Sequence, residues 1–134
     1  MIVHECVAFI LIDDGKVLLE QRSLYQGSGS ALLNIPGGHI ETGEDQVTAL
    51  ARELTEELTV QLESHQFLCS LYYPATELQL IHYYVVTKWS GVIQALEAEA
   101  VYWHEIADAP LKGDTDKIAL SEYIRLSNCG AMTL

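Results

Sequence analysis

The chain has 134 residues, of which 49% are apolar, and its 19 acidic residues outnumber its 7 basic residues to give a formal net charge of -12. This length predicts one domain, residues 1–134, with a core of its own. So acidic a surface excludes a binder of nucleic acid polymers, because such binding needs phosphate neutralisation by Lys and Arg. A small phosphorylated ligand remains compatible, provided that metal ions supply the missing positive charge.

Membrane and disulfide-rich proteins are also excluded. The longest apolar run, residues 7–12, is far shorter than the roughly 20 residues of a membrane span. The first five residues carry no basic region, so we expect no signal peptide, a cytoplasmic location and no membrane partner. Cys6, Cys69 and Cys129 are odd in number and lack CxxC spacing. They predict reduced thiols rather than a disulfide framework or a zinc site.

The first predicted elements form a hairpin. Residues 4–12 are rich in β-branched and apolar side chains and predict a buried strand, and residues 16–22 predict its partner. Asp13-Asp14-Gly15 between them supplies the positive φ values that a tight turn needs. Two segments follow in order: a loop at residues 23–31 and a short strand at residues 32–35, ended by Pro36-Gly37-Gly38.

The clearest predicted helix covers residues 45–58. Its apolar residues recur at helical spacing and form one stripe: Val47, Leu50, Ala51, Leu54 and Leu58. At about 3.6 residues per turn, the side chains of Glu53, Glu56 and Glu57 fall within roughly 100° of arc, opposite that stripe. Three carboxylates are therefore expected on one face of this helix.

The rest of the chain predicts strands and one more helix. In order, the pattern predicts a strand over residues 65–73, a turn over 74–77, and strands over 78–89 and 100–106. Asp114 or Thr115 can cap a last helix that runs to about residue 126. Its expected core residues are Ala119, Leu120, Tyr123 and Ile124. The tail, residues 128–134, is expected to be weakly ordered. Strands with a helix in the middle and another at the end predict an α/β fold, a mixed sheet sandwiched between helices.

The three glutamates on the first helix admit two interpretations. Charge runs on helices are most often solvated faces, but such faces normally pair glutamate with lysine. Here Glu53 has like-charge neighbours at Glu56 and Glu57, and all three stand in the last turns, where the helix dipole disfavours anions. A bound divalent cation would turn this repulsion into a ligand set. Oxygen ligands suit Mg²⁺ or Mn²⁺ rather than zinc.

The loop before the helix strengthens the second interpretation. Pro36-Gly37-Gly38 and Gly43 allow backbone conformations closed to other residues. Glycines let the main chain approach a ligand and direct carbonyls or amides towards it. The alternative is an ordinary turn, but here the glycines lead into a helix that carries three clustered glutamates.

The stretch over residues 37–60 resembles the Nudix box, Gly-x5-Glu-x7-Arg-Glu-U-x-Glu-Glu-x-Gly-U, in which U is a bulky apolar residue. The residues at matching positions are Gly38, Glu44, Arg52, Glu53, Leu54, Glu56, Glu57 and Val60, and Glu41 and Gly43 complete the frequent opening of the box. The surrounding strand order also fits the MutT-like layout. The resemblance implies the Nudix fold and hydrolysis of a diphosphate linkage.

One position departs from the box, because Thr59 stands where the family has glycine. A glycine there would end the helix in the left-handed conformation. Positive φ is costly for β-branched Thr, so we expect the helix to end differently or to continue a little. A shifted Glu57 with lower activity stays open.

The resemblance implies roles for the box residues. Glu53, Glu56 and Glu57 would bind Mg²⁺ or Mn²⁺, and Gly37 would offer its carbonyl to the metal. Arg52 would orient a glutamate through a charge-assisted hydrogen bond, with a weak surface ion pair as the alternative. Water would attack a phosphorus of the diphosphate while the metal neutralises the oxygens. The general base would be Glu53, or next Glu56.

Residues beyond the box complete the predicted site. MutT-like members often use a further glutamate before a Trp-containing strand, which favours Glu97 over Glu99 as a metal ligand; exposed loop acids are the alternative. Candidate substrate contacts are a phosphate-binding arginine, a close-approach glycine and three base-lining residues, namely Arg22, Gly38, Asn34, Tyr83 and Asp114. Ordinary structural roles stay open for them, such as a helix N-cap for Asp114 and a strand position for Tyr83.

Three functions stay open in order of preference. The first is hydrolysis of a nucleoside triphosphate to a monophosphate and pyrophosphate. The second is hydrolysis of ADP-ribose or another nucleotide sugar; Pro74 stands one or two positions before the proline that this subgroup tends to have. The third is a nucleotide sensor that no longer cuts its ligand, although such domains usually lose a box glutamate. The expected partner is a small nucleotide, and a homodimer is left open because family members often dimerise.

Overall fold

The computed structural model describes residues 2–22, 32–98 and 100–132, with the side chains of Arg22 and Leu32 left out. The predicted loop over 23–31 and Glu99 lie outside the described residues. Within the described ranges the strands are β1 Val3–Asp13, β2 Lys16–Arg22, β3 Leu32–Asn34, β4 Gly37–His39, β5 Gln61–Pro74, β6 Leu78–Ser90 and β7 Ala100–Glu105. The helices are α1 Gln46–Leu58, the 3-10 turn η1 Ile106–Asp108 and α2 Asp114–Asn128.

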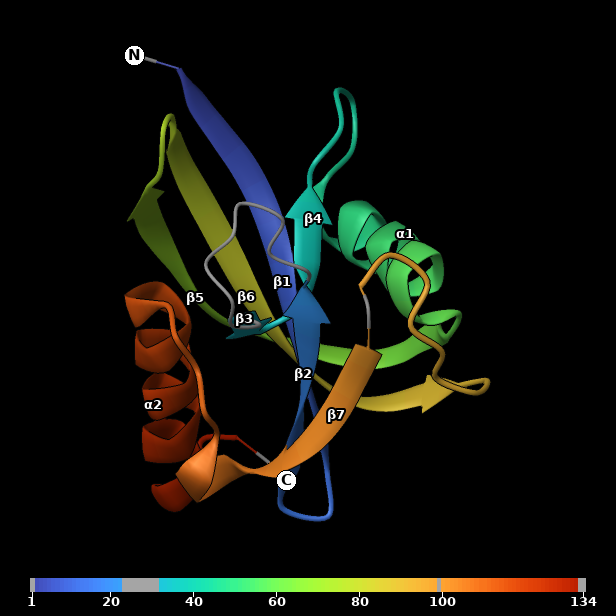
Figure 1. Ribbon diagram of the computed structural model, residues 1–134, viewed down its shortest axis with the longest axis vertical. Coiled ribbons are helices and arrows are strands. Elements are labelled where there is room, and N and C mark those ends of the chain that lie inside the picture. The colour runs from blue at the N-terminus through green and yellow to red at the C-terminus, as the bar shows by residue number, and fades with distance from the viewer. Residues whose placement is uncertain (1, 23–31, 99, 133–134) are drawn as a thin grey trace.

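The strands form one mixed sheet with the order β3-β2-β1-β6-β5, while β4 also pairs with β1 and β7 with β2. Strands β1 and β6 run parallel, and the other pairs are antiparallel. Helices α1 and α2 cover opposite sides of this sheet (Figure 1). The predicted α/β sandwich is therefore confirmed.

Two hydrophobic cores lie on the two faces of β1. Ile10 and its alternate neighbours pack with Leu120 and Tyr123 of α2, whereas Phe9 and its alternate neighbours pack with Leu50 of α1. A strand that is buried on both faces must be apolar at every position rather than at every second one. This explains the uninterrupted apolar run in the first predicted strand.

Strand β4 was not predicted. Gly37 and Gly38 pair with Ala8 and Val7 of β1, and the Phe9 amide donates to the Pro36 carbonyl at 2.9 Å. A Cβ on Gly37 would overlap the backbone of β1. Only a residue without a side chain lets the two strands approach so closely, so the Gly-Gly pair here builds a strand.

Helix α1 begins and ends at specific side chains. Asp45 is its N-cap and accepts a hydrogen bond from the Thr48 amide at 2.8 Å. Thr59 ends the helix in the left-handed conformation, with φ 63° and ψ 24°. The expectation that Thr could not take this role was wrong. Its hydroxyl donates to the Leu58 carbonyl at 2.6 Å or the Val92 carbonyl at 2.7 Å, which offsets part of the backbone cost.

The C-terminal region differs from prediction at both ends of α2. The N-cap of α2 is Gly113, so Asp114 lies within the first helical turn rather than capping it. Beyond the helix, the Ala131 amide donates to the Leu126 carbonyl at 2.9 Å, and Met132 is buried in the core on the α2 side. In the described part of the tail, Met132 packs into the core, whereas residues 128–131 are exposed; residues 133–134 lie outside the description, and weak order of the tail stays a prediction.

Other element bounds change little. Strand β5 extends beyond the predicted residues 65–73 at both ends, since register irregularities near Ser64 and Phe67 let it stay paired with β6 along its whole length. Among the described residues, no helix has the length and apolar character to cross a membrane.

Candidate active site

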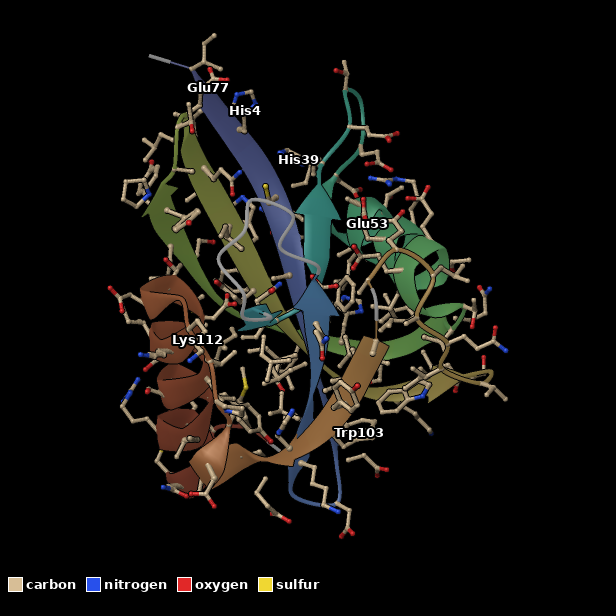
Figure 2. All side chains as sticks on the ribbon, in the orientation of Figure 1. His4, His39, Glu53, Glu77, Trp103 and Lys112 are labelled. Atoms are coloured by element: carbon tan, nitrogen blue, oxygen red, sulfur yellow. The ribbon has the colours of Figure 1, made fainter. Side chains whose placement is uncertain are left out.

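A cavity of about 770 Å³ is lined by residues of α1, of α2 and of several strands. Strands β1 to β6, one face of α1, the loop that carries Glu97 and the segment that enters α2 all contribute to its lining. Glu53 marks the α1 side of this region and Lys112 the α2 side (Figure 2). Side chains from distant parts of the chain therefore face one shared space.

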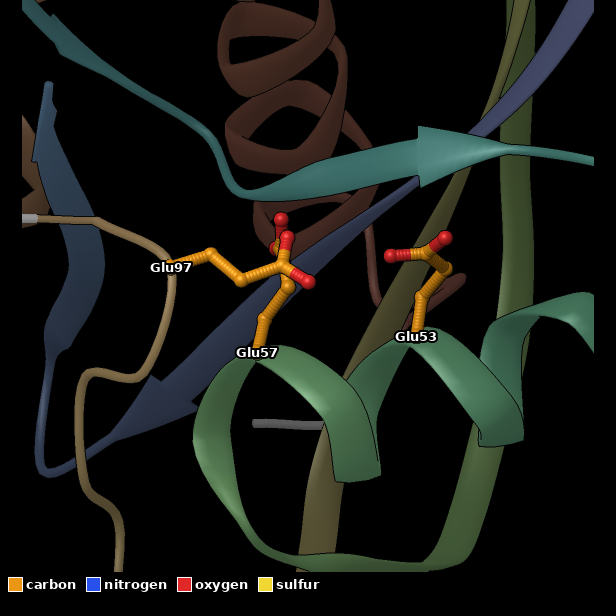
Figure 3. Close-up of side chains that lie close together, drawn as sticks. All are labelled: Glu53, Glu57 and Glu97. Carbon is orange, nitrogen blue, oxygen red and sulfur yellow. The ribbon is translucent and has the colours of Figure 1, made fainter.

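Three carboxylates converge at the α1 side of the cavity. Glu53 and Glu57 project from successive turns of α1, and Glu97 reaches them from the loop between β6 and β7 (Figure 3). One oxygen from each carboxylate lies within 4.8 Å of the others. Glu53 and Glu57 are only 8% and 3% exposed, whereas Glu97 is exposed.

The loop that carries Glu97 is fixed to the end of α1. The Leu96 amide donates to the Glu57 carbonyl, and the Gln94 amide donates to the Leu58 carbonyl, both at 3.0 Å. These bonds satisfy carbonyls that the helix end would otherwise leave open. The same contacts bring Glu97 to the glutamates of α1, so helix termination and site assembly depend on the same backbone bonds.

The position of the glutamates on α1 corrects the sequence prediction. Glu53 and Glu57 do not lie opposite the apolar stripe; they are buried beside Leu50 and Leu54. Val47, predicted to belong to the stripe, is 39% exposed. The prediction was wrong because, at about 100° per residue, Glu57 lies only about 20° around the helix from Leu50, so it shares the buried side of α1.

Arg52 links the box carboxylates. Its guanidinium donates to both oxygens of Glu44 at 2.6 and 2.9 Å, to Glu53 at 2.9 Å, to Glu56 at 2.9 Å and to the His39 carbonyl at 2.9 Å. The hydrogen bonds from Arg52 lower the pKa of Glu44 to about 2, and those carboxylates in turn raise the pKa of Arg52. The planar fork of arginine, unlike an ammonium group, can serve several carboxylates at once.

Glu53 lies in an environment that opposes its charge. Burial raises its pKa, as do the carboxylates of Glu56 and Glu97, while the bonds from Arg52 act in the opposite direction. A divalent cation would relieve both the desolvation and the mutual repulsion. The donors are all carboxylate oxygens, and such a set fits Mg²⁺ or Mn²⁺.

Gly38 leaves the room that the Glu53 carboxylate occupies. A Cβ on Gly38 would overlap both carboxylate oxygens of Glu53. Gly38 must therefore be a glycine because the carboxylate of Glu53, 15 positions further along the chain, occupies the space of a side chain. Both glycines line the cavity.

The α2 side of the cavity carries a second polar group of residues. Asp116 accepts hydrogen bonds from the Tyr83 hydroxyl at 2.6 Å and from the Ile35 amide at 3.0 Å. Asn34 donates to Glu20 at 2.8 Å. Burial raises the pKa of Asp116, and burial followed by the nearby Asp116 raises that of Tyr83.

The cavity brings together most of the predicted site residues. Those that line it are Asn34, Gly37, Gly38, Arg52, Glu53, Glu56, Glu57, Tyr83 and Glu97. Glu56 lines it without joining the close carboxylate cluster, and its Oε2 accepts from Arg52. Asp114 is exposed and does not line it. The side chain of Arg22 lies outside the described residues.

The lining residues that the sequence interpretation did not name include two acidic groups, the buried Glu20 and the partly buried Asp116. Glu20 directly follows the apolar run Val17-Leu18-Leu19 of β2, and this charged residue at the end of a buried run is a signal that could have been used. Asp116 replaces the predicted Asp114, because α2 begins at Asp114 and turns the later residue inwards. Asp114 and Asp116 lie about half a helical turn apart. The helical pattern of the sequence does not show which of the two faces the cavity.

The described cavity wall is strongly acidic. Its acidic residues are Glu20, Glu41, Glu53, Glu56, Glu57, Glu97 and Asp116, against the cations Arg52 and Lys112. Arg52 is already bonded to three carboxylates. A polyphosphate would therefore meet net repulsion on this wall unless it entered together with cations.

Comparisons with known proteins agree with this geometry. The family model for the NUDIX domain matches residues 3–124. CTP pyrophosphohydrolase of Escherichia coli K12 is 36% identical over 101 residues, which cover 74% of this chain and 73% of that protein. The solution structure of the E. coli ORF135 protein superposes with a TM-score of 0.85 at 32% identity, covering 96% of this chain and 94% of that one. The crystal structure of a MutT NUDIX hydrolase from Burkholderia pseudomallei gives a TM-score of 0.81 at 25% identity, covering 91% and 98%. With the match over nearly the whole chain and its box residues gathered around one cavity, the protein belongs to the Nudix family of hydrolases.

Proposed function

We propose that this protein is a metal-dependent pyrophosphohydrolase that cleaves a nucleoside triphosphate into a nucleoside monophosphate and pyrophosphate. The convergence of Glu53, Glu57 and Glu97 on one side of the cavity carries the proposal. The E. coli relative named CTP pyrophosphohydrolase supports a triphosphate as the substrate. The polar group around Asn34 and Asp116 supports a base or sugar at the other side.

The proposed ligands for Mg²⁺ or Mn²⁺ are Glu53, Glu57 and Glu97, with Glu56 and the Gly37 carbonyl as further candidates. When bound, the metal supplies charge neutralisation of the phosphate oxygens and activation of water. Two of the three clustered carboxylates are buried, and burying like charges together is costly without a counter-charge. The same counter-charge would let a triphosphate enter the acidic cavity.

In the proposed reaction the protein positions carboxylates and accepts a proton. Arg52 holds Glu53 through its Nη1, so that the carboxylate keeps one orientation. Glu53 takes the proton of the attacking water and Glu56 is the second candidate, since each gives only one oxygen to Arg52. The second oxygen of each side chain can serve as a base.

The proposal is tested with a panel of nucleoside triphosphates, ADP-ribose and nucleotide sugars, each incubated with Mg²⁺ or Mn²⁺. We expect release of pyrophosphate from triphosphates, and none when the metal is chelated. Glu57→Gln should lower kcat/KM by about 100-fold or more, as expected for loss of a metal ligand. The exposed Glu63→Gln on β5 is the matched control and should retain wild-type activity.

The same panel separates the rival functions. Faster turnover of ADP-ribose than of any triphosphate would replace the proposed substrate class. Tight nucleotide binding without turnover of any phosphoanhydride would identify a sensor.

The general base is assigned by measuring kcat and metal affinity of the Glu53→Gln variant. Glu53→Gln should lower kcat more than it lowers metal affinity. The opposite pattern would favour Glu56 as the base.

A further inference from the structure

A buried charged residue supports one of the cavity walls without belonging to the carboxylate cluster. Glu20 on β2 is directly opposite Asn34 on β3, and it is only 3% exposed. Both side chains line the cavity. A glutamate buried to this degree in a strand is costly unless it makes strong hydrogen bonds. Such a position in the wall indicates a role that an apolar strand residue could not perform.

The contacts of Asn34 define the orientation of its side-chain amide. Its Nδ2 donates to Glu20 Oε1 at 2.8 Å and to the Ile35 carbonyl at 3.4 Å. Both partners are acceptors, so a flipped amide would set Oδ1 against a carboxylate and a carbonyl oxygen. The orientation therefore follows from hydrogen-bond chemistry.

This orientation leaves the Asn34 carbonyl for a ligand. Within the described part of the chain, Asn34 Oδ1 accepts no hydrogen bond. The nearby Asp116 also presents oxygens, which Tyr83 and the Ile35 amide hold in position. A ligand that meets this wall must bring hydrogen-bond donors, because an acceptor would stand against oxygen atoms.

Resting on the proposed function, we propose that Glu20 is a positioning residue that fixes the Asn34 carbonyl towards the cavity, so that the enzyme selects bases with an exocyclic amino group. Cytosine carries an amino donor at C4, whereas uracil carries an acceptor oxygen at the same place. The two pyrimidines are otherwise nearly the same in shape. The preference of the enzyme for cytosine over uracil therefore depends on the orientation of the Asn34 side-chain amide.

The test compares CTP and UTP in the intact enzyme with Mg²⁺. We expect the wild type to favour CTP by about tenfold or more in kcat/KM, expressed mainly in KM, since a polar site strongly rejects a ligand that leaves its groups unpaired. In Glu20→Gln, the new amide can donate to Asn34 Oδ1 and hold the flipped form. The preference should then fall to about threefold or less, while kcat with CTP changes little.

The control is Glu105→Gln, the same chemical change at an exposed residue of the neighbouring strand β7, which should retain the wild-type ratio. An unchanged CTP-to-UTP ratio in Glu20→Gln overturns the proposal, including the case in which both substrates slow equally, because that is the sign of a structural role. A wild type without preference for CTP also overturns it. Should Glu20→Gln fail to fold, Asn34→Ala must abolish the preference instead.

Failure of the proposed function is recognised separately. If the wild type hydrolyses no triphosphate, the hydrolase proposal fails, and the selection is judged by calorimetric titration with CMP and UMP. Tighter binding of CMP that is lost in Glu20→Gln supports the positioning role. Equal binding of the two monophosphates to the wild type overturns it.

Discussion

Arg52 meets Glu44 through two parallel hydrogen bonds, from Nε to Oε2 at 2.6 Å and from Nη2 to Oε1 at 2.9 Å. The pair ties the loop before α1 to the helix itself. Glu44 also accepts from the Glu41 amide at 2.9 Å, and Arg52 continues to Glu53 at the carboxylate cluster. The geometry of the loop and the orientation of Glu53 are therefore linked through one guanidinium.

This linkage predicts that Arg52→Lys is not conservative. Lysine keeps the charge but cannot reach Glu44, Glu53 and Glu56 together, because its ammonium is a single point. We expect kcat/KM to fall by about 10- to 100-fold, as for loss of a residue that orients metal ligands. Arg125→Lys on the exposed face of α2 is the matched control, since Arg125 also holds Glu122 through two hydrogen bonds. Equal activity of both variants would contradict the prediction.

The low pKa of Glu44 predicts a pH-dependent contribution to stability. The folded value is about 2, below the ordinary value of 4.5, so folding favours the ionised form. The contribution is complete above about pH 4.5 and is lost as the pH falls towards 2. Glu44→Gln should therefore flatten the loss of Tm across this window. The check is thermal unfolding of both proteins at several pH values, and parallel curves would sink the idea.

The space left by Gly38 predicts a steric effect on metal binding. In Gly38→Ala the added methyl group would overlap the Glu53 carboxylate and displace it. We expect the affinity for Mn²⁺ to fall by about tenfold or more, as when the orientation of a metal ligand is lost. Gly113→Ala adds the same methyl group where no atom lies within 4 Å, and it should retain the wild-type affinity for Mn²⁺. Titration with Mn²⁺ measures both, and an unaffected Gly38→Ala would count against Glu53 as a ligand.

The left-handed Thr59 predicts an order of stabilities. Thr59→Ala keeps the backbone cost but loses the hydroxyl that bonds to carbonyl oxygens, so it should be less stable than the wild type by about 1 kcal/mol. Thr59→Gly loses the same hydroxyl but removes the cost of positive φ. It should exceed the alanine variant by about 1 kcal/mol in the free energy of unfolding. Denaturant unfolding checks the order, and an alanine variant equal to or above glycine would refute it.

The sequence by itself determined the features whose signals lie within a few residues. Helix α1, predicted over residues 45–58 and found at Gln46–Leu58, and the spacing of its glutamates follow from local periodicity. The apolar run in β1 likewise predicted a buried strand, and the structure shows that both of its faces are buried. Each of these patterns is carried by consecutive residues of one element. Such a pattern can therefore be recognised without knowing how the rest of the chain folds.

Only the tertiary structure decided which side chains share the site. The burial of Glu53 and Glu57 depends on β4 and on the Glu97 loop, which is held by backbone bonds to the end of α1. Glu20 and Asp116 enter the cavity through strand pairing and helix packing across the fold. Such contacts join residues far apart in the chain, and their register is set by the whole packed sheet rather than by any local pattern.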